Sequence, residues 1–512
     1  MDGRIFGKDI NGKRGGAAAG PDAAGGIVLT LFLCILIPAV SFYAPTGYQD
    51  LGEMKFRCFR AVSAVFALLL LPAVVQRAVK TLGEHGKGRR PILPVDAAAG
   101  ACALLLIVSW LLAADRRESF WGTVGWRMGL FTQLMGFFIY FCCRLMRVRL
   151  RWILTSAELT AFVVFLFAVL NRLGIYPLPY MGVSPDFLST IGNADWYAGY
   201  LAVFLPVFAA DLFTALRPVD LGLSRTEEGP KKENAGRKTE NTGEACRRLF
   251  VLLGLLTGLA SAATQGTASG LLALCASAAV LLAAGLLIRG RRSATSAPDT
   301  KSKAFRIEAY GIIAALGFAF LIGLAIVWIH ANADGEPARS LIAYLYFRHG
   351  IDFRAEWGNG RGVIWRLAGE LYRGLPPLRR LFGVGPDGFP AWIGTQPQLL
   401  QSIGSYYGAV RVANAHCALF TAMIDEGVLF AVSLAVFYAA LFFGFIRSLR
   451  GGSGDTDAAA LCGAMMTASA AAQQMFTFRT VVTAPFFLAF AGILMRAVHR
   501  QERGNDIQGT DN

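Results

Sequence analysis

Long apolar runs alternate with short polar segments along the whole chain. A helix rises about 1.5 Å per residue, so about 20 apolar residues cross the roughly 30 Å hydrocarbon core of a bilayer. Runs of about this length predict spans at residues 26–44, 59–79, 95–114, 125–143, 152–171, 194–216, 249–264, 267–288, 308–329, 416–446, 457–478 and 480–498. The pattern therefore predicts an all-α polytopic membrane protein with about twelve transmembrane helices.

The longest interruption of this pattern is residues 330–415, between the ninth and tenth predicted spans. The stretch Leu341–Phe347 is short and aromatic, which suits a segment lying in the plane of the membrane interface. Residues 361–373 predict an amphipathic helix, with Gly374-Leu375-Pro376-Pro377 as its stop. The apolar face of that helix consists of Ile364, Leu367, Ala368 and Leu371. The loop is therefore expected to be partly helical.

The composition supports this fold class. The chain is 55% hydrophobic and only 16% charged, whereas soluble domains average about 25% charged residues. The net charge is +15, but the basic residues separate the apolar runs instead of forming one patch, so we expect no nucleic-acid partner. The nine cysteines lack Cys-x-x-Cys spacing, so we expect neither a zinc site nor a structural disulfide.

The positions of Lys and Arg predict the orientation. With the N-terminus inside, the inner segments hold 32 basic residues, the short outer segments hold 8 and the long loop holds 9. Basic residues favour the cytoplasmic side, and loops longer than about 60 residues do not count in this rule. Both termini are therefore predicted to be cytoplasmic, and the long loop extracytoplasmic.

The predicted organisation follows from these spans and their orientation. Its parts are a cytoplasmic tail at 1–25, spans one to nine at 26–329 with a disordered polar cytoplasmic linker at 217–248, an extracytoplasmic loop at 330–415, spans ten to twelve at 416–498 and a cytoplasmic tail at 499–512.

All nine basic residues of the long loop are arginines. A guanidinium binds phosphate oxygens bidentately and stays charged when it is desolvated, although a solvated cationic face or lipid-headgroup contacts would use the same residues. Asn359-Gly360 precedes the predicted helix, which puts Arg361 in its first turn. A helix N-terminus beside an arginine is suited to bind an anion.

Two histidines and one turn are further candidates for parts of a functional site. His416 lies where the loop re-enters the membrane, and it can act as a general base or simply bond the backbone at the interface. His349 follows Arg348 in the loop. The turn from Ser189 to Trp196 precedes a predicted span, and its polar groups suit a sugar hydroxyl or an anion as well as simple capping.

Several motifs, in their order and spacing, resemble the O-antigen ligase and O-antigen polymerase family of bacterial membrane glycosyltransferases. These motifs are Gly192-Asn193-Ala194, Gly360-Arg361-Gly362 with Trp365, the run from Phe382 to Phe389, Asn414-Ala415-His416 and Glu426-Gly427. The resemblance covers roughly residues 26 to 498. Two positions depart from the family: Cys417 replaces the usual Asn after the histidine, and the turn Thr264–Ser269 lacks the Ser-Arg that relatives often carry.

The resemblance implies glycan transfer from a polyprenyl-diphosphate-linked donor on the outer face of the bacterial cytoplasmic membrane, in the biosynthesis of envelope polysaccharide. His416 and Arg361 would be catalytic, and Asn193, Asn414 and Trp365 would contact the acceptor or the sugar. The donor diphosphate would be held by Arg348, His349, Arg354 and Arg366, and Arg348, Arg354 or Arg361 could replace the missing turn arginine. No metal or other cofactor is required if arginines carry the charge.

Other interpretations remain open at this stage. The acceptor can be a glycan, a lipid or a protein, and the enzyme either a ligase or a polymerase. A transporter or flippase for a lipid-linked or anionic saccharide is the main alternative, although few ionisable residues lie inside the spans: Glu158 and Asp211 are the clearest. A non-catalytic scaffold for other envelope-assembly proteins would use the long loop as a docking surface.

Overall fold

The structure is a computed structural model, and it describes residues 21–85, 93–176, 187–215, 233–295, 357–407, 412–451 and 457–509. The helices in the first part of the chain are α1 (Pro21–Phe42), α2 (Leu51–His85), α3 (Pro94–Leu111), α4 (Arg116–Trp121), α5 (Leu130–Leu145), α6 (Leu150–Arg172), α7 (Ala194–Ala215), α8 (Glu233–Thr264) and α9 (Ala268–Thr295). Those in the second part are α12 (Trp357–Gly374), α13 (Pro377–Phe382), α14 (Phe389–Gly394), α15 (Pro397–Tyr407), α16 (Ala418–Asp425), α17 (Val428–Gly451), α18 (Asp457–Gln474) and α19 (Ala484–Gly509). Two short strands, β1 (Phe187–Leu188) and β2 (Gly192–Asn193), pair antiparallel just before α7.

The chain is an all-α polytopic membrane protein. Among the described residues, seven helices are long and apolar enough to cross a bilayer: α1, α2, α3, α6, α7, α8 and α17. Shorter apolar segments lie in α5, α9 and α19. Of the twelve predicted spans, the one at 308–329 lies outside the described residues, and the count of twelve stays a prediction.

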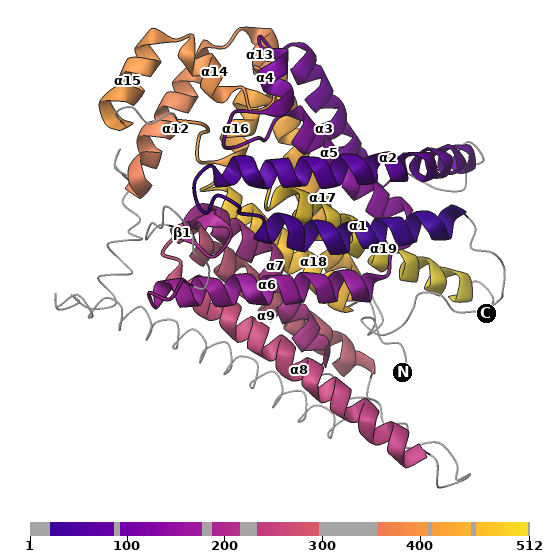
Figure 1. The fold of residues 1–512 in the computed structure, drawn as a ribbon. Helices are drawn as coiled ribbons and strands as arrows, with labels where there is room; N and C mark the ends of the chain where they lie inside the picture. The colour runs from indigo at the N-terminus through magenta and orange to yellow at the C-terminus, as the bar shows by residue number, and fades with distance from the viewer. Residues whose placement is uncertain are drawn as a thin grey trace.

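The long helices run side by side (Figure 1). Helix α1 packs against α2 and α6, while α18 packs against α7, α9 and α17. The apolar stretch of α7 is buried along its whole length, and Tyr197, Tyr200, Phe204 and Phe208 are among its buried rings. Helix α7 is therefore the central helix of the bundle.

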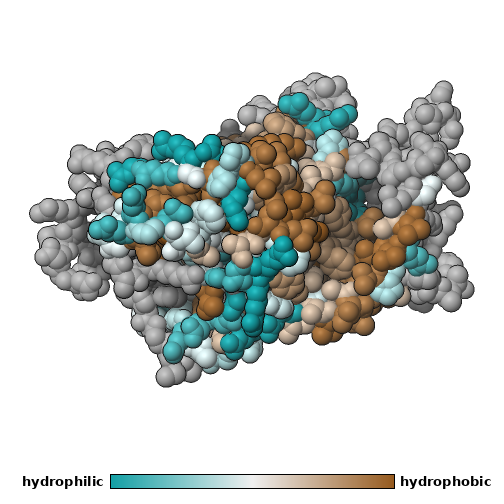
Figure 2. All heavy atoms as spheres, turned by 90° about the horizontal axis from the view of Figure 1, so that it is seen from above, coloured by the Kyte–Doolittle hydropathy of each residue, from teal (hydrophilic) through white to brown (hydrophobic). Residues whose placement is uncertain are grey.

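The outward-facing surface of several helices is apolar. On α2, the side chains of Leu68, Leu69, Val75 and Val79 are more than half exposed. Figure 2 shows a broad apolar area over the middle of the face seen from above, with hydrophilic side chains gathered toward one end. Exposed leucine and valine on this scale are typical of a surface that faces lipid.

A small group of helices, α12 to α15, lies at one end of the bundle, which we call the loop end; α7 begins there (Figure 1). The group has its own apolar core, in which Ile364, Leu367 and Leu371 of α12 pack with Phe389 and Ile403. The predicted amphipathic helix is confirmed, because its four apolar positions are all buried and α12 ends at Gly374.

Three predicted boundaries were wrong. Helix α12 begins at Trp357, so Arg361 lies one turn inside the helix and not in its first turn. The single span predicted at 416–446 is two helices, because Gly427 between α16 and α17 has a φ of 88° that favours glycine. Helix α8 begins at Glu233, so residues 233–248 of the predicted linker are helical.

Candidate functional site

The loop end brings together two residues that sequence analysis singled out, Arg361 and His416. Arg361 lies on α12, and His416 lies just before α16, outside the helices that can span a membrane. The Arg361 guanidinium lies close enough to His416 for its positive charge to lower the pKa of the histidine. The predicted residues Arg348, His349 and Arg354 and the stretch Leu341–Phe347 lie outside the described residues.

Arg361 forms an ion pair with Asp195, the second residue of α7. The Arg361 Nη2 atom lies 3.1 Å from Asp195 Oδ2 and 3.3 Å from Oδ1. Each side chain keeps about 15% of its surface exposed, 15% for the arginine and 16% for the aspartate. This pair joins the α12–α15 group to the central helix of the bundle.

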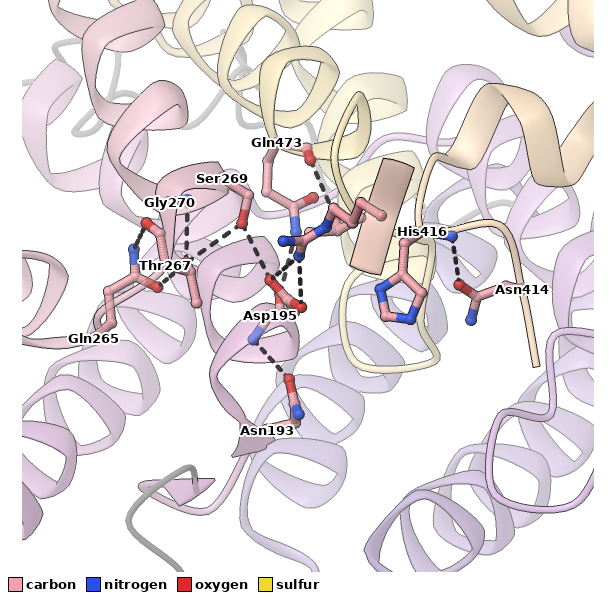
Figure 3. Close-up of polar contacts among 11 residues, drawn as sticks. Asn193, Asp195, Gln265, Thr267, Ser269, Gly270, Asn414, His416 and Gln473 are labelled. Atoms are coloured by element: carbon pink, nitrogen blue, oxygen red, sulfur yellow. Dashed lines mark hydrogen bonds and ion pairs between the residues drawn. The ribbon is translucent and has the colours of Figure 1, made fainter. Parts of the chain in front are cut away.

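Asp195 is fixed by several polar contacts (Figure 3). Its backbone N–H donates to Asn193 Oδ1 at 2.8 Å, and Ser269 Oγ donates to its carboxylate at 3.3 Å. Gln473 Nε2 of α18 donates to the Asp195 carbonyl at 3.1 Å. Asn193, a predicted sugar contact, therefore caps the start of α7 with its side chain.

The turn between α8 and α9 lies on the other side of Asp195 from His416 (Figure 3). Thr267 Oγ1 donates to Gln265 Oε1 at 2.7 Å and accepts from the Gly270 N–H at 3.3 Å, which closes the turn. Arg172, from the end of α6, donates to the Gln265 carbonyl at 3.3 Å. An arginine thus contacts the turn that lacks an arginine of its own.

His416 has an unusual backbone conformation. Its φ is 47°, in the left-handed region that few residues other than glycine and asparagine adopt. Two hydrogen bonds hold this turn: the His416 N–H donates to Asn414 Oδ1 at 2.9 Å, and the Ala415 N–H donates to Thr421 Oγ1 at 3.1 Å. Asn414, also a predicted sugar contact, uses its carbonyl oxygen to position His416.

The imidazole of His416 is neutral at neutral pH. Burial lowers the pKa of His416 to about 4, and the positive charge of Arg361 contributes to the same shift. The ring meets Phe478 edge-on, with 5.2 Å between ring centroids. A neutral imidazole beside a guanidinium can accept a hydrogen bond or a proton from a hydroxyl group.

Aromatic side chains surround these polar groups. Trp126 contacts both Trp196 and Phe478, with ring centroids 5.6 Å and 4.5 Å away. Trp365, one turn beyond Arg361, stacks on Phe476 with 5.9 Å between centroids and is partly exposed. Arg366 is exposed on α12. Aromatic faces next to polar groups provide surfaces on which sugar rings can stack.

A second charged cluster lies behind His416. Arg479, in the turn between α18 and α19, pairs with Glu426 at 3.3 Å, and Gln133 of α5 hydrogen-bonds to both side chains. Asp387 Oδ2 accepts the backbone N–H groups of Thr123 at 2.6 Å and Met128 at 3.1 Å. Burial raises the pKa of Asp387 to about 7.

Sequence analysis identified only part of these clusters. Asp195 lies in the turn whose polar groups suit an anion, a sugar hydroxyl or capping, and Glu426 lies in a motif, but the sequence indicates no ion-pair partner for either residue and no role for Arg479. Their partners come from positions 53 to 346 residues away in the chain, so no local pattern could have indicated the pairing.

The described residues contain no group of three or more His, Cys, Asp or Glu side chains arranged to hold a metal ion. All nine cysteines are free thiols. A comparison with protein-family models and with curated proteins found no match to the chain.

Proposed function

We propose that this protein transfers a glycan from a polyprenyl-diphosphate-linked donor to an acceptor on the outer face of the bacterial cytoplasmic membrane. The observation that carries the proposal is the convergence of Arg361 and His416, 55 positions apart in the numbering, beside Asp195 at the loop end of the bundle. A guanidinium and a neutral imidazole are the two groups that such a transfer needs. The loop end would face outward, as the distribution of Lys and Arg predicts.

In the proposed reaction, an acceptor hydroxyl attacks the anomeric carbon of the donor sugar. The new glycosidic bond forms as the bond from that carbon to the diphosphate oxygen breaks, and the bonding electron pair leaves with the diphosphate. His416 accepts the hydroxyl proton, and Arg361 stabilises the negative charge of the leaving group. No metal ion takes part in this scheme, because arginine supplies the positive charge.

The ion pair with Asp195 suits this role. A diphosphate carries more negative charge than a carboxylate and can replace Asp195 as the partner of Arg361. Because the diphosphate carries more negative charge than Asp195, it offsets more of the Arg361 charge, which adds to the effect of burial in lowering the pKa of His416. The histidine then becomes a stronger base when the donor is bound. Donor binding would therefore prepare the site for the acceptor.

Two further residues extend the proposal. Arg172, at the Gln265 turn, is the arginine we propose in place of the missing turn arginine, because it lies on the same side of Asp195 as Ser269. Trp365 is the proposed sugar-stacking residue, since it is partly exposed and lies on the same helix as Arg361.

The proposal is tested in cells that carry His416→Ala or Arg361→Ala. We expect surface glycan to fall at least about 100-fold while the protein accumulates normally, since positioned acid–base groups contribute about this much. Arg373→Ala is the matched control, because Arg373 is exposed near the end of the same helix. Full glycan in the His416→Ala strain would refute the assignment.

Lipid-linked intermediates identify the type of transferase. Long intact chains that remain on the polyprenyl carrier in a deletion strain would indicate a ligase, whereas single repeat units would indicate a polymerase. The same analysis separates the glycan acceptor from a lipid or protein acceptor, because the product missing from the envelope differs in each case.

A transporter or flippase for a lipid-linked saccharide is the second candidate. It is favoured by Glu158 of α6 and Asp211 of α7, two buried carboxyl groups within membrane-spanning helices, with Arg247 of α8 at 2.7 Å from Asp211. Buried ionisable groups in spans often mark transport pathways. If Glu158→Gln and Asp211→Asn abolish surface glycan while His416→Ala does not, this candidate replaces the transferase.

A further inference from the structure

A small cavity with several polar lining groups lies beside the His416 turn. It is lined by Asp387, Asn414, Thr421, Asp425, Glu426 and Arg479, together with the Phe478 ring that contacts His416. Its volume of about 20 Å³ accommodates one water molecule, which needs roughly 10–15 Å³, but not a sugar. The cavity is therefore not a substrate pocket.

The hydrogen bonds of the lining carboxyl groups differ. Glu426 is bonded to Arg479 and Gln133, and Asp387 accepts two backbone N–H groups. Asp425 is only 2% exposed, and within the described part of the chain its Oδ1 atom has no hydrogen-bond partner. A buried carboxyl oxygen without a partner is costly, so this atom indicates a bound group in the cavity.

The cavity is connected to His416 through the backbone. Asn414 and Thr421 line it, and these two side chains accept the N–H groups of His416 and Ala415. A water molecule in the cavity can accept a hydrogen bond from the Asn414 amide and can donate to the neighbouring carboxylates. Asp425 and the side chains that hold the strained turn therefore adjoin one cavity.

We propose that Asp425 is a positioning residue: in its protonated form it shares one water molecule with Asn414 and so holds the left-handed turn that presents His416. The inference rests on the proposed function, because it assigns His416 to the reaction. Asp425 does not touch the substrate. It acts through the water molecule and Asn414.

The surroundings of Asp425 favour its neutral form. Burial raises the pKa of Asp425, and the negative charges of Glu426 and Asp387 raise it further, whereas a hydrogen bond from the Phe389 backbone N–H and the nearby Arg479 oppose them. From helix α3, the uncharged Ser109 donates its hydroxyl hydrogen bond to the Asp425 backbone carbonyl at 2.9 Å. Ionisation at high pH would place another negative charge in the cavity and disturb the water. Activity should therefore fall as the pH rises.

The test measures surface glycan by pulse labelling in cells at external pH values from about 6 to 8.5. Asp425→Asn keeps a neutral side chain of the same shape, so we expect it to retain at least half of the wild-type rate at pH 6. At pH 8.5, where the wild type declines, the Asn variant should stay active. Asp425→Ala should lose about tenfold in rate across the whole range, at equal accumulation.

Two outcomes would overturn the inference: an alkaline decline in Asp425→Asn that equals that of the wild type, or a wild-type rate in Asp425→Ala. Asp387→Asn identifies the titrating group, because it retains the alkaline decline if Asp425 is responsible. If Asp425→Ala does not accumulate, the pH profile of Asp425→Asn still tests whether Asp425 holds the His416 turn. Failure of the proposed function is distinguishable, since His416→Ala would then keep full surface glycan.

Discussion

The ion pairs of Arg361 with Asp195 and of Arg479 with Glu426, both at the loop end of the bundle, differ in how far their carboxylates are buried. In the pair of Arg361 and Asp195, 15% and 16% of the side-chain surfaces remain exposed, with 3.1 Å between the charged atoms. In the pair of Arg479 and Glu426, these fractions are 12% and 1%, at a distance of 3.3 Å. The distances are similar, so the accessibility of the carboxylate is the difference that matters.

Because Asp195 is accessible and Glu426 is enclosed, the two ion pairs suit different roles. Glu426 is enclosed: Gln133 donates to it and accepts from Arg479, while the Arg479 guanidinium lies 5.4 Å from the centre of the Phe430 ring. Asp195 retains contact with solvent and can be displaced from Arg361 by a more highly charged anion. An arginine whose carboxylate partner is accessible can exchange partners, whereas one whose partner is enclosed holds the helices together.

The largest expected effect comes from breaking the enclosed pair. Arg479→Met leaves Glu426 buried without a positive partner, which should destabilise the protein by about 3–5 kcal/mol. The protein should then hardly accumulate in membranes. Arg361→Met should cost at most about 1 kcal/mol, because the pair is partly exposed.

The measurements are the amount of protein in membranes and the Tm in detergent. The double variant Arg479→Met with Glu426→Gln is the control, because it removes the unpaired charge and should recover part of the stability. Equal accumulation of Arg479→Met and Arg361→Met would contradict the distinction between the two pairs.

The next effect is the pH dependence of the free energy of unfolding, which arises from the buried Asp387 near the enclosed pair. Burial raises the pKa of Asp387 from 3.8 to about 7. The folded state therefore holds this proton more tightly than the unfolded chain, and the resulting stability is complete below pH 4 and is lost as the pH rises to about 7. Between pH 5.5 and 7.5, the wild type should lose about 2 kcal/mol of its free energy of unfolding.

Asp387→Asn tests this origin, because one amide oxygen can still accept the N–H groups of Thr123 and Met128 but the side chain cannot titrate. The Tm of the variant in detergent should vary less between these pH values than that of the wild type. Parallel curves for the two proteins would assign the pH dependence to another group.

The next effect is on the amount of surface glycan, and it tests the accessible pair of Arg361 and Asp195. Arg361→Lys keeps the positive charge but loses the planar fork that binds two phosphate oxygens at once. Surface glycan should fall about tenfold or more while accumulation stays normal. Arg373→Lys on the same helix is the control. Full surface glycan in the Arg361→Lys strain would mean that a point charge at this position is sufficient.

Local patterns predicted the helices of this chain well. The four apolar positions of α12 follow a helical period that is visible in the sequence, and all four are buried. Hydropathy missed the break at Gly427, because the short acidic pair Asp425-Glu426 before it is enclosed by longer apolar runs on both sides. There a Cβ atom would collide with the carbonyl of Leu381, which lies 46 positions earlier in the chain.

The functional site was less predictable, for a physical reason. Arg361 and His416 could be selected by residue type and resemblance, but Asp195 lies 166 positions from its partner Arg361. No periodicity carries such a pairing, since it depends on how α12 docks on the start of α7. The same holds for Asp425, whose significance lies in an oxygen atom with no hydrogen-bond partner among the described residues.

The smallest predicted effect is on the affinity for pyrophosphate, and it tests whether an anion replaces Asp195 as the partner of Arg361. Asp195→Asn removes the carboxylate that competes for Arg361, so inorganic pyrophosphate should bind the detergent-purified protein about fivefold more tightly, as expected for a partly exposed pair worth about 1 kcal/mol. Titration calorimetry measures this affinity. Glu370→Gln is the contrasting variant and should leave the affinity unchanged, because Glu370 is an exposed carboxylate on the same helix as Arg361. Weaker pyrophosphate binding in Asp195→Asn would mean that Asp195 orients Arg361 for the anion instead of competing with it.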